Sequence, residues 1–232
     1  MPASLVFASG VAWRSLDAER GTKLMRILIY GFGPYRRFRE NITTKIIAAL
    51  PKRAGLKKLV FPVRFQRAPF VQALKQHNPD IVLGLGQSSR RAIEIETRAV
   101  NRRRVRTAEK LRPIFTREHK QLATTLNVKA PRWAKVSKDA GDYVCNYSMY
   151  VMLREIVRER LNVSFGFIHI PHDYDERAAR RFIERVLRQC YRSQARRITK
   201  PAAQLPSRGK QAFSTGRSTA RAGVVRSSGL GA

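Results

Sequence analysis

A cysteine and a histidine have the types and the order along the chain of a nucleophile and its base. Cys145 follows the glycine-containing stretch at 139–142 and begins a segment with the apolar spacing of a helix. A thiol at a helix N-terminus meets the positive end of the helix dipole and unpaired backbone N–H groups, which favour the thiolate. A buried structural cysteine is the alternative interpretation of this position.

His169 lies near the C-terminal end of an apolar run, residues 165–170, that predicts a buried strand. Sites of parallel α/β sheets gather at that edge, and an imidazole can accept a thiol proton and return it to a leaving amine. A carboxylate that orients the imidazole would complete the set, and Glu94 or Glu96 could supply it. The alternatives are a histidine satisfied within the core and glutamates on an exposed strand face.

Apolar runs alternate with amphipathic helical patterns through the middle of the chain. This alternation favours an α/β fold, a three-layer α/β/α sandwich with a mainly parallel central sheet. Strands are expected at 26–30, 59–63, 80–86 and 165–170, and helices at 42–50, 68–77, 118–126, 147–161 and 176–191.

The two ends of the chain differ from this middle. Residues 1–24 precede the first strong strand pattern and are expected to be an N-terminal extension, disordered or not translated if Met25 is the start. Residues 192–232 are rich in Ser, Gly, Ala and Arg with few large apolar side chains, so a disordered basic tail is expected. Residues 25–191 are then expected to form the catalytic domain.

The chain is strongly basic, with 47 Lys and Arg against 16 Asp and Glu and a formal net charge of +31. Such a balance suits a polyanion such as nucleic acid. However, no nucleic-acid recognition motif is present, and aromatic residues are not interleaved with the arginine clusters. A nucleic-acid partner is therefore disfavoured without being excluded, and a solvated basic surface is the simpler interpretation.

The cysteine count points to a reducing environment. Cys145 and Cys190 do not make a disulfide framework, and no cysteine–histidine spacing resembles a zinc site. No stretch has the length of a membrane span, and the N-terminus lacks the basic first region of a secretory signal. A cytoplasmic protein without a metal and without a membrane partner is expected.

Four motifs resemble those of one family, the pyroglutamyl peptidases, also called pyrrolidone-carboxylate peptidases. The family's AGTFVCNHxMYxxL is similar to AGDYVCNYSMYVML at 140–153, and its GFIHIP stands unchanged at 166–171. GQSSRRAIEIETRAVN at 86–101 resembles GQAGGRxxITPERVAIN, and residues 31–35 match GFEPFGG in part. The motifs follow in family order, and Cys145 precedes His169 by the family's 24 positions.

The resemblance implies a cysteine peptidase that removes an N-terminal pyroglutamyl residue from a peptide through an acyl enzyme. It implies Cys145 as the nucleophile, His169 as general base and acid, and Glu96 as the group that orients His169. Glu96 is preferred to Glu94 because it precedes Asn101 by the family's interval. The implied partner is a peptide with a blocked N-terminus, no cofactor is implied, and a homo-oligomer is left open.

The resemblance also implies a substrate site. Phe32 and Tyr35 would enclose the lactam ring, with core side chains beside a turn as the alternative. The predicted substrate-binding residues are Phe32, Tyr35, Gln87, Arg91 and Val144.

Departures from the family pattern near this site leave other functions open. Arg36 and Arg37 replace two glycines, only 49 positions separate Glu96 from Cys145, and Asp142 replaces a threonine. A carboxylate near the thiol opposes formation of the thiolate. A divergent amidase with the same trio and a different, acidic substrate is therefore the second hypothesis, and a basic nucleic-acid-binding protein on a hydrolase scaffold is the third.

Overall fold

The computed structural model describes residues 24–35, 38–106 and 108–199 of the chain. The expected N-terminal extension apart from Leu24, the pair Arg36 and Arg37, and the expected tail beyond Thr199 lie outside the described residues. Within these ranges, no helix is both long enough and apolar enough to span a membrane.

The central sheet has six strands in the described part of the chain, in the order β2-β1-β3-β8-β4-β7. The central strands β1, β3 and β8 are buried along nearly their whole length, which is why they appear in the sequence as continuous apolar runs. Only β4 against β8 is antiparallel in this sheet. The bounds are β1 (Ile27–Phe32), β2 (Leu56–Phe61), β3 (Ile81–Ser88), β4 (Glu94–Glu96), β7 (Lys135–Ser137) and β8 (Ser164–Pro171).

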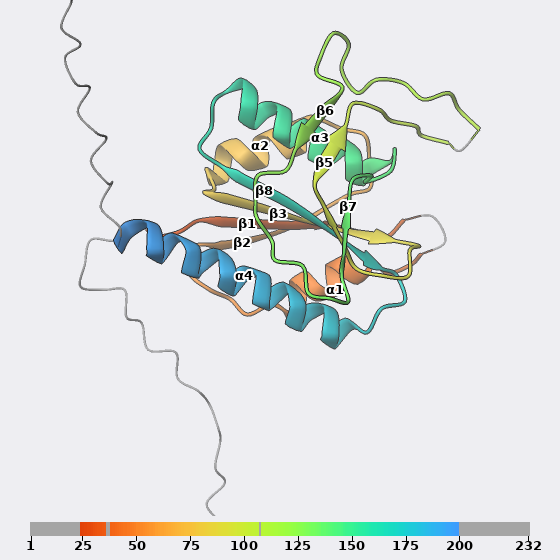
Figure 1. Cartoon of the computed structure of the whole chain (residues 1–232). Helices are drawn as coiled ribbons and strands as arrows, with labels where there is room; N and C mark the ends of the chain where they lie inside the picture. The colour runs from red at the N-terminus through yellow and green to blue at the C-terminus, as the bar shows by residue number, and fades with distance from the viewer. Residues whose placement is uncertain (1–23, 36–37, 107, 200–232) are drawn as a thin grey trace, which may run out of the picture. The chain divides into compact units, whose positions relative to one another are not determined.

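Helices cover both faces of the sheet, as Figure 1 shows. The helices α1 (Ile42–Ala49) and α4 (Glu176–Thr199) share one core with the sheet, and α2 (Ala68–His77) and α3 (Val144–Arg158) share the other. Beside α3 lies a separate antiparallel pair, β5 (Arg98–Val100) and β6 (Gln121–Ala123). The predicted α/β/α sandwich with a mainly parallel sheet is confirmed.

The helix predicted at residues 118–126 is wrong. Residues 121–123 instead form β6, which pairs with β5. The N–H groups of Thr125 and Leu126 then both donate to the carbonyl oxygen of Phe165 at 2.9 Å. Hydrogen bonds to strands distant in the sequence outweigh a weak local preference for helix.

The last helix is longer than the apolar pattern predicts. It continues eight residues beyond the expected end at Tyr191, to Thr199. The segment after Tyr191 contains Gln, Ala and Arg, which are strong helix formers, so the helix can propagate beyond its apolar stripe.

Two glycines of β3 leave room for the side-chain rings of the β8 residues that pair with them. Gly84 pairs with Phe167, and Gly86 pairs with His169. A Cβ atom at Gly84 would lie 2.3 Å from the Phe167 ring and 2.7 Å from that of Tyr30, and one at Gly86 would lie 2.8 Å from His169 Nε2. The two glycines therefore provide the space in which Phe167 and His169 are packed.

We expect Gly84→Ala to lower the free energy of unfolding by about 1–3 kcal/mol, because the added methyl group overlaps two buried rings. Urea unfolding would measure the change. Gly33→Ala is the matched control, since among the described residues its Cβ would approach only the carbonyl oxygen of Phe61, at an ordinary 3.8 Å. Equal loss of stability in both variants would contradict the close packing described here.

Candidate active site

The antiparallel pairing of β4 with β8 places Glu96 beside His169. Glu94 lies opposite His169 and Glu96 opposite Phe167, so both glutamates stand on the same face of the sheet as the imidazole. The Nδ1–H of His169 donates to Glu96 Oε1 at 2.8 Å, and both side chains are buried. This contact leaves Nε2 of the ring for Cys145.

Glu94, the other candidate carboxylate, has a different partner. It forms an ion pair with Arg90, which also donates to the carbonyl oxygen of Asp139 at 2.8 Å. Glu96, in contrast, is only 1% exposed, so the alternative of an exposed strand face does not hold for it. The geometry therefore favours Glu96 as the group that orients His169.

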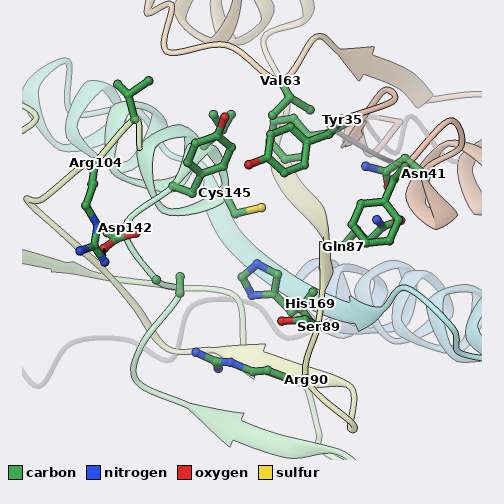
Figure 2. A pocket seen from close by; sticks show the side chains of 18 of the residues that line it. Tyr35, Asn41, Val63, Gln87, Ser89, Arg90, Arg104, Asp142, Cys145 and His169 are labelled. Atoms are coloured by element: carbon green, nitrogen blue, oxygen red, sulfur yellow. Dashed lines mark ion pairs between the residues drawn. The ribbon is translucent and has the colours of Figure 1, made fainter. Parts of the chain in front are cut away.

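Cys145 lies in the first turn of α3, with its sulfur directed toward His169 (Figure 2). Within the described chain, no side chain caps this end of the helix at Tyr143, so N–H groups of the first turn can stabilise a negative charge. The Ser148 hydroxyl donates to the Cys145 carbonyl oxygen at 2.8 Å and lies 3.1 Å from the buried hydroxyl of Tyr30. These buried contacts hold the turn that carries the thiol.

The surroundings of His169 favour its protonated form. Burial alone lowers the pKa of an imidazole, but the charge of Cys145 and the hydrogen bond to it, together with Glu96, raise the pKa of His169 to about 9. An imidazolium between a sulfur and a carboxylate is the arrangement that a thiolate–imidazolium pair requires. The three side chains thus have the arrangement that a nucleophile, an acid–base group and an orienting carboxylate would need.

The carboxylate of Asp142, three residues before Cys145, is paired with a guanidinium. Arg104 Nη2 lies 2.6 Å from Asp142 Oδ2, and the Arg104 N–H donates to the Asp142 carbonyl oxygen at 2.8 Å. Opposite charges at this distance largely cancel at the sulfur, so the opposition of Asp142 to a thiolate is reduced.

One side of the site is built from the end of β1 and the loop that follows it. Phe32 ends β1, and Tyr35 is held by two backbone hydrogen bonds with Phe38, of 3.0 and 2.9 Å. Asn41, the N-cap residue of α1, fastens the same loop by donating from Nδ2 to the Gly33 carbonyl oxygen at 3.1 Å. The loop is therefore anchored on both sides of Tyr35.

Cys145 and His169 line a pocket of about 630 Å³. Four of the predicted substrate-binding residues also line it: Phe32, Tyr35, Gln87 and Val144. Gln87, near the end of β3, accepts a hydrogen bond from the Ile42 N–H at 3.0 Å, which ties β3 to the start of α1. Phe32 is both a core residue and a wall of the pocket, since it is buried against Tyr30.

Arg91 is the predicted site residue that the structure does not bring to the pocket. It is exposed and is not among the described residues that line the pocket, whereas Arg90 is. Glu94 and the Asp139 carbonyl oxygen anchor Arg90 at the wall. Arg90 therefore takes the place expected for Arg91.

Comparison with known proteins agrees with this geometry. The family model for pyroglutamyl peptidase matches residues 25–179. The chain belongs to the pyroglutamyl peptidase family. It is therefore a cysteine peptidase by descent, and its trio and pocket lie within the matched residues.

Relatives in this family are pyrrolidone-carboxylate peptidases. That of Clostridium botulinum is 33% identical over 170 residues, which cover 64% of this chain and 79% of the relative. Pyrrolidone-carboxylate peptidase 1 of Saccharolobus solfataricus is 31% identical over 169 residues, which cover 63% of this chain and 79% of the relative. The solved pyrrolidone carboxyl peptidase from Thermococcus litoralis shares the fold, with a TM-score of 0.68 at 22% identity over 79% of this chain and 100% of that chain.

Two parts of this pyroglutamyl peptidase site are missed by the sequence reasoning. The first is Tyr143, which lines the pocket with its ring centroid 5.0 Å from that of Tyr35 and 5.1 Å from that of Phe65. The sequence signal that could have pointed to Tyr143 is an aromatic residue directly before Val144. Its ring partners Tyr35 and Phe65 lie in distant segments, and no sequence pattern links them to Tyr143.

The second is Asn146, which is fully buried beside the nucleophile. Its amide oxygen accepts from the Val100 N–H at 2.8 Å, and its amide nitrogen donates to the carbonyl oxygens of Val100 and Arg102 at 2.8 and 2.9 Å. One side chain thereby fastens the end of β5 to the first turn of α3. The motif contains this residue, but its role depends on a strand 46 positions earlier.

Asn146→Asp should destabilise the fold by about 2–4 kcal/mol, because it replaces two buried donors with an oxygen that faces two carbonyl groups. Thermal or urea unfolding would measure the loss. The control Asn78→Asp makes the same chemical change at the exposed, left-handed C-cap of α2 and should cost less than about 0.5 kcal/mol. An Asn146→Asp variant as stable as this control would show that the amide does not fasten β5.

Proposed function

We propose that this peptidase hydrolyses the amide bond after an N-terminal pyroglutamyl residue, through an acyl enzyme on Cys145. The observation that carries the proposal is the trio itself: the Cys145 sulfur faces His169, and His169 Nδ1 is 2.8 Å from the buried Glu96. The trio lies beside a pocket with aromatic walls, and the relatives are named as pyrrolidone-carboxylate peptidases.

In the first step, the Cys145 sulfur attacks the carbonyl carbon of the pyroglutamyl residue. The C–S bond forms as the carbonyl electrons move onto oxygen, and N–H groups of the first turn of α3 stabilise that oxyanion. The His169 imidazolium then gives its Nε2 proton to the leaving nitrogen as the C–N bond breaks. Glu96 keeps the ring oriented and stabilises the imidazolium in this step.

In the second step, water hydrolyses the thioester. Neutral His169 accepts a proton from water at Nε2 while the water oxygen bonds to the acyl carbon. The C–S bond breaks, and its electrons return to the Cys145 sulfur. Pyroglutamate leaves, and the thiolate–imidazolium pair is restored.

The charges of the pocket suit a blocked N-terminus. A free α-amino group is a cation, and it would need an uncommitted carboxylate. Among the described lining residues the only carboxylate is that of Asp142, which is paired with Arg104. The lactam of a pyroglutamyl residue is neutral, and the residues proposed to hold it, Phe32, Tyr35, Gln87 and Val144, all line the pocket.

Cys145→Ala should reduce release of a fluorophore from a pyroglutamyl amide by about 1,000-fold or more, because it removes the sulfur that attacks the carbonyl carbon. Cys190→Ala is the matched control. Cys190 lies in the core shared by α1 and α4, so its removal should leave the rate nearly unchanged. Equal rates in the two variants, or no release by the unaltered protein, would disprove the assignment.

The value of kcat/KM should fall as the pH rises through about 9, because His169 then loses the proton that the leaving amine needs. Glu96→Gln removes a negative charge that raises this pKa, so the fall should begin at lower pH. A pH–rate profile on the fluorogenic substrate measures both. Glu159→Gln, at the exposed far end of α3, removes the same charge and should leave the profile unchanged. If kcat/KM of Glu96→Gln fell at the same high pH as that of the unaltered protein, the role of Glu96 would be contradicted.

A further inference from the structure

The pocket has two chemically different sides, with Cys145 between them. Figure 2 shows Tyr35, Val63 and Asn41 to one side of the sulfur, and Arg104 with Asp142 to the other. The first side carries the residues proposed to hold the lactam ring. Because the scissile bond must lie at the sulfur, the residue after the pyroglutamyl group extends toward the second side.

The wall at the second side is residues 104–106, which belong to the segment that joins β5 to β6. We call the described residues of this segment, 101–106 and 108–120, the arm; they extend away from the sheet beside β5 and β6 (Figure 1). The base of the arm is fastened to the loop that leads into α3. Arg102 Nη2 lies 2.7 Å from Asp139 Oδ1, and the Arg104–Asp142 pair adds a charged and a backbone hydrogen bond. These contacts set the position of residues 104–106 relative to the nucleophile before any substrate arrives.

Arg106 is the cation of this wall for which no described residue supplies a counter-ion. Arg104 forms an ion pair with Asp142, and Arg90, which also lines the pocket, forms one with Glu94. The side chain of Arg106 is exposed and makes no hydrogen bond or ion pair with any residue that the structure describes. Its guanidinium can therefore bind a ligand without first breaking an internal contact.

A carboxylate is the group that this end of the pocket is built to bind. A guanidinium holds a carboxylate through two parallel hydrogen bonds, which adds geometric selectivity to the charge attraction. A lysine or arginine of the substrate would instead approach three arginines and a single, already paired carboxylate among the described lining residues. The net charge of +31 acts in the same direction, because it raises the local concentration of anionic peptides.

We infer that Arg106 binds the side-chain carboxylate of an Asp or Glu that directly follows the pyroglutamyl residue, and that this peptidase prefers such peptides. The inference rests on the proposed function and adds to it the class of the second residue. Arg106 is a specificity-determining residue and takes no part in bond breaking.

The test compares pyroglutamyl peptides of one length whose second residue is Asp, Glu, Ala or Lys. Released pyroglutamate is quantified by mass spectrometry to give kcat/KM for each peptide. We expect Asp and Glu to exceed Ala by about threefold to fivefold, the effect of one exposed ion pair, mainly through KM. The preference should shrink at high salt, which screens exposed charges. Arg106→Ala should abolish the preference, and Arg106→Glu should reverse the order of Asp and Lys.

Arg132→Ala is the matched control. It removes the same charge from an exposed position outside the pocket, next to Trp133, which packs on Phe182 of α4 on the other face of the sheet. The preference for Asp and Glu should be unchanged in this variant.

The outcomes separate this inference from the proposed function. Equal kcat/KM for all four peptides would overturn the inference and leave the proposed function standing. A preference for acidic peptides that survives in Arg106→Ala, or that falls equally in Arg132→Ala, would also overturn it, since net charge alone would then explain it. Cleavage of none of the pyroglutamyl peptides would overturn the proposed function and the inference together.

Discussion

The hydrogen bond between Glu96 and His169 joins two strands that run in opposite directions, and it places a carboxylate where water does not reach. A buried carboxylate is stable only with a partner of opposite charge or with hydrogen bonds to its oxygens. Glu96 Oε2 is buried without a hydrogen bond to any described residue, so the compensating charges lie at Oε1, where the His169 imidazolium is 2.8 Å away and Arg90 Nη1 4.0 Å away. Burial of Glu96 and protonation of His169 therefore depend on each other.

The short interval between Glu96 and Cys145 imposes a second constraint. The chain must leave β4, form β5, the arm, β6 and β7, and return to the helix that carries the thiol. Asn146 and the Arg104–Asp142 pair fasten β5 and the base of the arm to the start of α3 and the loop before it. Some of the excess arginines of the sequence thus form ion pairs at the site. One of them, Arg104, pairs with Asp142, a residue that departs from the family pattern.

Much of the fold is visible in the sequence where the pattern is local. The helix at 68–77 has its predicted bounds because its apolar spacing and its Pro near the start lie within the segment and Asn78 directly follows it. The helix predicted at 118–126 fails because β6 is stabilised by partners at 98–100, and no local pattern encodes that pairing. The choice of Arg90 over Arg91 likewise depends on contacts with Glu94 and the Asp139 carbonyl oxygen that neighbouring residues in the sequence do not reveal.

The sequence by itself determined the residue types of the trio, their order, the alternation of strands and helices, and through its motifs the family. Each of these depends on side-chain chemistry or on periodicity within a short segment. Only the tertiary structure decided that Arg90 and not Arg91 lines the pocket, that Asp142 is paired with Arg104, that Asn146 holds β5, and that the Arg106 side chain in the pocket wall has no ion pair with a described residue. These features arise from distances between segments tens of residues apart, and such distances exist only once the sheet has brought the strand ends together.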